Sequence, residues 1–294
     1  MQPTAHPQLN RDHLRSNLDV VARAAAIKLK RQALALLPHG SSERRPQDPF
    51  KLAAILGLEI IPVSKLYGDA RLFKVGAKWL VEIAKHTSKV RQRFSCAHEL
   101  GHYLLQVHAQ DVLASIHDVA PNDGGDNFEE RVCNLFAAEF LFPTSAIMSM
   151  VNRRGGLRMC DFIDRAERCE VSLRTAAIQV VSAKPAYVFC LIKHFAVGSH
   201  AADLRVAWSA APSHTFVPKY SSVGSDVAAA LASGGPSVGT GKVSLGSVRG
   251  TYRFAAQPND SSNPRSGGWL LIYLDPQRPL PMSHTSLVRE QVPT

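Results

Sequence analysis

The segment RFSCAHELGHYLL, residues 93–105, contains a His-Glu-x-x-His pattern within a run that is predicted to be helical. Residues four apart on a helix share one face and lie one turn apart, so His98 and His102 can bind a single zinc ion. Glu99 lies about 100° around the helix from His98, which places its carboxylate to accept a proton from a zinc-activated water. A glycine costs about 1 kcal/mol inside a helix, so Gly101 indicates a close approach by another backbone or by a substrate. The pattern therefore predicts metal-assisted hydrolysis of a peptide bond.

A zinc site of this kind needs a third protein ligand, and the residues alone leave several open. His108 has the outer spacing of a His-Glu-x-x-His-x-x-Gly-x-x-His motif, but Leu105 stands where that motif has a chain-reversing glycine. If the helix continues, His108 lies about 15 Å along its axis from His98, too far to share an ion. The next predicted helix offers carboxylates instead, and two histidines with one glutamate are a common zinc-peptidase set. Its glutamates are Glu129, Glu130 and Glu139.

Hydrophobic periodicity divides the rest of the chain into a helical part and a β-rich part. Helices are predicted at residues 11–37, 50–57, 89–108 and 127–142, with two or three short ones within 144–183. Strands are predicted at residues 58–63, 70–76 and 78–84, the last two joined as a hairpin by a Gly-Ala turn. After Pro185, the runs AYVFCLIKHF, DLRVAWSAA, GTYRFAA and GGWLLIYLD indicate further strands. This change in pattern predicts a separate C-terminal domain.

Composition favours a cytoplasmic protein without membrane spans. The 294-residue chain is 45% hydrophobic, and no apolar run reaches the roughly 18 residues that a spanning helix needs. The first ten residues lack the basic start and apolar core of a secretory signal. The five cysteines form no CxxC pair, which indicates reduced, buried thiols rather than a disulfide framework. A net charge of +10 favours acidic partners, including nucleic acid, or equally a basic surface without a specific role.

The metal-motif helix and the helix after it together resemble the ImmA/IrrE-type metallopeptidases. In that family an Arg-Phe-Thr-x-Ala lead enters HExGH, and E-x-x-A-N-x-F-A-A-E-L-L-M-P follows about 25–30 residues later. The second motif is matched by Glu130, Asn134, Phe136, Ala137, Ala138, Glu139, Leu141 and Pro143. The departures are conservative: Ser95 replaces threonine, Cys133 alanine and Phe142 methionine. The resemblance extends from about residue 49 to about residue 183.

This resemblance implies a ligand set, a general base and a substrate class. The implied zinc ligands are His98, His102 and Glu130, with Glu99 as the general base, so the resemblance selects Glu130 over Glu129. The implied cofactor is Zn²⁺, and Mn²⁺ is an alternative because these ligand types accept both ions. Members of the family are intracellular and cleave repressors with helix-turn-helix domains, which switches on mobile-element or stress-response genes. Such a repressor is therefore the expected partner, while the sequence indicates no oligomeric state.

The expected fold class is α+β. A zincin-like peptidase core with a small antiparallel sheet and the HExxH helix is followed by a helical segment and a mixed α/β C-terminal domain. One branch of the family has a sensor-like domain at this last position. The expected divisions are an N-terminal helical extension and linker (1–48), the metallopeptidase core (49–148), a helix-turn-helix-like segment (149–184), the C-terminal domain (185–276) and a flexible tail (277–294).

Residues 157–181 support a second interpretation of the chain. They predict two helices separated by a turn, with Ser172 as the N-cap of the second and with arginines that could meet phosphates. In this alternative the zinc fold is a non-hydrolytic scaffold for protein or DNA binding, with a weak nucleic-acid contact. A zinc hydrolase of another class is a third alternative. We favour a helical pair packed on a peptidase core, because no adjacent aromatic or basic cluster indicates base readout.

Overall fold

The computed structural model describes residues 7–37, 47–119, 125–151, 156–197, 200–259 and 267–274. The predicted tail at 277–294 and residues 38–46 of the predicted linker lie outside these ranges. The chain divides into two compact units, one of Met1–Ile147 with Arg165–Gln179 and one of Met148–Asp164 with Val180–Thr294. The overall class is α+β, as predicted, and the finer division into five segments stays a prediction.

A three-stranded sheet with the order β1-β3-β2 lies in the first unit. Its strands are β1 (Glu59–Val63), β2 (Ala70–Val75) and β3 (Lys78–Ala84). β2 and β3 form the predicted hairpin, in which Val75 pairs with Lys78 and Gly76 has a φ of 60° that glycine adopts readily. β1, however, pairs with β3 in parallel, so the prediction of an antiparallel sheet is correct for β2 and β3 and wrong for β1. The reason is that the chain reverses direction twice between β1 and β3.

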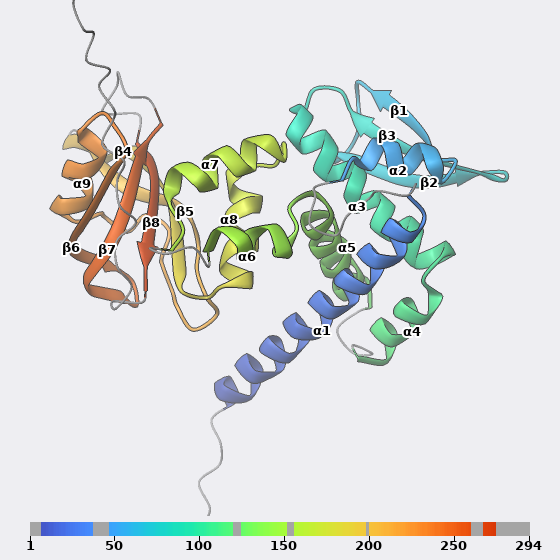
Figure 1. Cartoon of the computed structure of the whole chain (residues 1–294), viewed down its shortest axis with the longest axis horizontal. Coiled ribbons are helices and arrows are strands. Elements are labelled where there is room, and N and C mark those ends of the chain that lie inside the picture. The colour runs from blue at the N-terminus through green and yellow to red at the C-terminus, as the bar shows by residue number, and fades with distance from the viewer. Residues whose placement is uncertain are drawn as a thin grey trace, which may run out of the picture. The chain divides into compact units, whose positions relative to one another are not determined.

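Five helices belong wholly to the first unit: α1 (Pro7–Ala35), α2 (Pro49–Ile55), α3 (Lys89–Val107), α4 (Gln110–Val119) and α5 (Gly125–Leu141). α3 begins where the Ser88 hydroxyl accepts a hydrogen bond from the Arg91 amide, and it ends at His108. α1, α3 and α5 pack side by side (Figure 1). α1 buries Ala22, Ala26, Leu29 and Ala33 at helical spacing, and α5 buries Val132, Phe136 and Phe140. α4 was not predicted.

Three short helices follow, as predicted: α6 (Thr144–Val151), α7 (Met159–Arg168) and α8 (Leu173–Ala183). The predicted N-cap of the last helix is confirmed, because the Ser172 hydroxyl accepts a hydrogen bond from the Thr175 amide at 3.1 Å. Residues 173–179 of α8 belong to the same unit as α3 and α5.

The second unit contains a five-stranded antiparallel sheet with the order β5-β4-β8-β7-β6. Its strands are β4 (Tyr187–Val197), β5 (His200–Ala210), β6 (Ser237–Leu245), β7 (Val248–Pro258) and β8 (Gly268–Tyr273). Helix α9 (Ser225–Ala232) covers one face of this sheet, and its Val227 and Leu231 enter the core there (Figure 1). β6 and α9 were not predicted.

All five cysteines are free, and four of them are buried as predicted, whereas Cys160 is exposed. Within the described residues no single helix is long and apolar enough to cross a membrane. One bent pair, Phe128–Leu141 with Thr144–Val151, meets the length and composition criteria together.

Candidate metal centre

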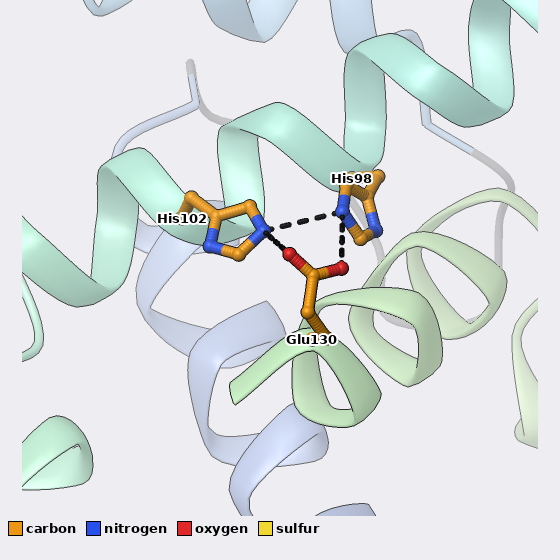
Figure 2. Close-up of side chains that lie close together, drawn as sticks. All are labelled: His98, His102 and Glu130. Carbon is orange, nitrogen blue, oxygen red and sulfur yellow. Dashed lines mark hydrogen bonds and ion pairs between the residues drawn. The ribbon is translucent and has the colours of Figure 1, made fainter. Parts of the chain in front are cut away.

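Three of the predicted site residues converge between α3 and α5. The side chains of His98 and His102 extend from α3, and Glu130 on α5 points toward both of them (Figure 2). The two imidazole Nε2 atoms lie 3.2 Å apart. Glu130 Oε2 lies 3.2 Å from His98 Nε2, and Glu130 Oε1 lies 3.2 Å from His102 Nε2. Both histidine side chains are largely buried, whereas that of Glu130 is 55% exposed, so the cluster opens to solvent on the glutamate side.

The spacing of these three donors fits a tetrahedral metal ion. Ligands about 2.0–2.1 Å from a tetrahedral zinc ion are separated from one another by about 3.3 Å. The two Nε2 atoms, 3.2 Å apart, match one edge of such a tetrahedron, and each of them also lies 3.2 Å from one oxygen of the Glu130 carboxylate. Two imidazoles and one carboxylate leave a fourth position open, as in catalytic rather than structural zinc sites.

Glu129 contacts the opposite side of the His102 ring. Its Oε1 lies 2.8 Å from His102 Nδ1, and both side chains are largely buried. When the His102 imidazole carries its proton on Nδ1, this N–H donates a hydrogen bond to the Glu129 carboxylate. The lone pair of Nε2 then points toward His98 and Glu130. Burial acts to lower the pKa of His102, but the Glu129 hydrogen bond and the surrounding carboxylates outweigh it and raise that pKa. Burial and the neighbouring His102 lower the pKa of His98 instead.

Glu99 is held beside the cluster by the backbone of the small sheet. Its Oε2 accepts a hydrogen bond of 2.9 Å from the amide of Leu72 on β2, an edge strand of the sheet. Burial raises the pKa of Glu99, and the His102 ring and the Leu72 amide oppose that shift. A carboxyl group whose pKa is shifted toward neutrality is a stronger base than a solvated one.

The close approach that Gly101 predicts is present at the crossing of α3 and α5. A Cβ atom at Gly101 would lie 3.1 Å from Cys133 Sγ and 3.2 Å from Cys133 Cα. Such contacts would force the helices apart. Gly101 therefore lets the backbone of α5 approach α3 closely, next to the histidines.

The other ligand candidates lie elsewhere. His108 caps the C-terminal end of α3 and contacts Tyr103, while Glu139 pairs with Lys30 in the interior. A second group in the described part of the chain, His102 with Glu129 and Cys133, also brings its ligand atoms within 4.8 Å of one another. Burial holds the pKa of the Cys133 thiol well above its usual range.

Sequence reasoning missed the amide of Leu72 and the orienting role of Glu129. A backbone amide leaves no signal in the side-chain pattern, since any residue of an edge strand could supply it. The sequence indicated Glu129 only as one of two adjacent glutamates that could be the third metal ligand.

Comparison with known proteins finds relatives of the segment that carries this cluster. The IrrE N-terminal-like domain matches residues 53–179. The radiation response metalloprotease IrrE of Deinococcus radiodurans is 35% identical over 95 residues, which cover 32% of this chain and 28% of the relative. The protein of the same name from Deinococcus deserti is 31% identical over 104 residues, which cover 35% of this chain and 37% of the relative. The matches thus span about a third of the length of these curated relatives.

Among solved structures, a Mycobacterium tuberculosis transcriptional regulator is similar with 14% identity and a TM-score of 0.47, over 90% of this chain and 89% of that one. The IrrE N-terminal-like match contains both helices of the cluster and the β2 strand that holds Glu99. Residues 53–179 thus form an IrrE N-terminal-like domain, which relates this part of the chain to the ImmA/IrrE metallopeptidases.

Proposed function

We propose that this chain is a zinc-dependent endopeptidase with His98, His102 and Glu130 as metal ligands and Glu99 as general base. The observation that carries the proposal is the partly buried Glu99 carboxylate, held beside two imidazoles and a carboxylate whose donor atoms lie 3.2 Å from one another across the cluster. When bound there, zinc supplies positive charge that polarises the scissile carbonyl and acidifies a water molecule. Mn²⁺ is the alternative ion for the same donors.

The proton transfers and the orientation of the ligands are assigned to residues of the chain itself. The Leu72 amide holds Glu99 Oε2, so Oε1 is the oxygen that takes the proton from the attacking water. Protonated Glu99 then gives that proton to the leaving amine. Glu129 fixes the tautomer and the angle of His102 through Nδ1. These roles match a general-base mechanism of peptide hydrolysis.

The edge strand β2 is placed to align an extended substrate. The amide of Leu72 points away from β3 and toward Glu99, and residues two apart on a strand point the same way. The backbone groups of Ala70 and Lys74 therefore also lie on this outer edge. An extended peptide that pairs with this edge would lie along the side of the strand that faces Glu99.

We infer that the substrate is a protein, and we propose a helix-turn-helix repressor whose cleavage relieves repression in a stress or mobile-element response. The family resemblance supports this class, and the Deinococcus relatives are named for the radiation response. The scaffold alternative receives no support from α8. Its Thr175, Ile178 and Gln179 line a cavity together with Glu130.

The test is co-expression with the helix-turn-helix repressor encoded nearest to the gene, with repressor length read by mass spectrometry. We expect wild type and Glu59→Gln, an exposed matched control on β1, to cut the repressor. Glu99→Gln should lose cutting by about 10²–10⁴-fold while retaining stoichiometric zinc. Equal cutting by Glu99→Gln would contradict its role, and an intact repressor with every variant would contradict this substrate class.

A further inference from the structure

A cavity of about 420 Å³ adjoins the candidate metal centre through Glu130. This volume lies within the usual range of ligand sites, about 300–1,000 Å³. Its walls come from α3, α5 and the first half of α8, all within one compact unit. The lining residues are Phe94, Glu130, Arg131, Asn134, Leu135, Ala138, Thr175, Ile178 and Gln179.

The chemistry of the lining favours an apolar occupant. Phe94, Leu135, Ala138 and Ile178 supply apolar walls on three sides. Of the two charged residues, Glu130 faces the histidines, and Arg131 pairs with Asp19 of α1. Both charges thus have partners outside the cavity, so the lining does not favour a charged side chain in the cavity.

The wall formed by α8 is fixed in place. The Gln179 side-chain amide donates hydrogen bonds to Glu139 Oε2 at 3.3 Å and to the Phe142 carbonyl at 3.4 Å. Gln179 is fully buried, so these contacts hold α8 against α5. Ile178 lines the cavity and is 47% exposed, so its side chain is accessible to a molecule that enters the cavity.

We propose that this cavity binds an apolar side chain of the substrate residue next to the scissile bond, and that Ile178 on α8 sets the size it accepts. The proposal rests on the zinc peptidase function argued above. The cavity and the candidate metal centre share Glu130, so the two spaces adjoin. A peptide whose scissile carbonyl lies at the metal centre therefore places an adjacent side chain in the cavity. α8 would then be a specificity element rather than a DNA-reading helix.

The experiment measures binding of two peptide hydroxamates to the zinc-loaded full chain by calorimetry. The probes differ only in the side chain next to the zinc-binding group, isobutyl in one and hydrogen in the other. We expect the isobutyl probe to bind wild type at least about tenfold more tightly. Ile178→Trp should fill the cavity and bring this ratio close to one, while the hydrogen probe still binds normally.

The matched control is Ile55→Trp, at an isoleucine of α2 that is 42% exposed and outside the cavity lining; its ratio should equal that of wild type. Normal binding of the hydrogen probe reports that each variant is folded and loaded. A ratio near one in wild type, or an unchanged ratio in Ile178→Trp, would overturn the pocket and leave the peptidase proposal standing. Failure of both probes to bind wild type with stoichiometric zinc would overturn the open metal centre and the pocket with it.

Discussion

At the residue scale, two adjacent glutamates on α5 have separate positions because neighbouring helical residues point about 100° apart. Glu130 faces the Nε2 atoms of both histidines, and Glu129 faces Nδ1 of His102. The helical periodicity of the sequence could not decide which of the two glutamates is the third metal ligand, since both lie near the edge of the buried face of α5. The family resemblance selected Glu130, which stays a prediction, and in the structure Glu130 and Glu129 each belong to a group that could hold a metal ion.

Replacing Glu129 should weaken metal binding without unfolding the chain. Glu129→Gln removes the charge that orients His102, and loss of such a partner costs about 10–100-fold in metal affinity. The measurement is the zinc Kd by competition with a chromophoric chelator, alongside the urea midpoint. Glu59→Gln serves as the control. An unchanged zinc Kd in Glu129→Gln would contradict the proposed role of Glu129 in orienting His102.

At the element scale, a buried carboxylate joins α1, α5, α6 and α8. Glu139 of α5 accepts hydrogen bonds from Lys30 at 3.1 Å, from the Thr144 hydroxyl at 2.6 Å and from the Gln179 amide. It also accepts from the Thr144 backbone amide at the start of α6, where a negative charge favours the helix. The helix that carries Glu130 is therefore anchored at its far end by an ion pair to α1.

Two lysines of α1 provide a matched test of this anchor. Lys30→Met removes the cation that is ion-paired with buried Glu139, although Arg23 stays nearby, and should destabilise the first unit by up to about 3–5 kcal/mol. Lys28→Met breaks only an exposed pair with Asp111 and should cost about 0–1 kcal/mol. Urea unfolding followed by circular dichroism measures both. Equal midpoints for the two variants would show that the buried pair does not anchor α1.

The sequence predicted elements with long, regular patterns and missed short or long-range features. α3 and α5 were found because their apolar residues recur over four or more turns between clear end signals. α9 has eight residues, half of them alanine, which are too few for a helical period to emerge. β6 is interrupted by Gly239 and Gly241, which lowers its strand propensity. The parallel pairing of β1 with β3 depends on contacts beyond any local window.

At the scale of the whole molecule, the candidate metal centre lies entirely within the first unit. A metal that binds only the folded state stabilises it by about 4 kcal/mol when its free concentration is 1,000 times its Kd. Chelation by EDTA should therefore lower the melting temperature of the first unit and leave the melting temperature of the second unit unchanged. Scanning calorimetry with and without EDTA measures both transitions. An equal shift of both transitions, or no shift, would contradict a metal confined to the first unit.

The central claim is that one metal ion binds at His98, His102 and Glu130. The most direct measurement is anomalous X-ray scattering at the zinc edge from crystals of the zinc-loaded protein. The account predicts a single peak about 2.0–2.2 Å from both Nε2 atoms and from a carboxylate oxygen of Glu130. A peak between His102 Nδ1, Glu129 and Cys133, or no peak between α3 and α5, would contradict it.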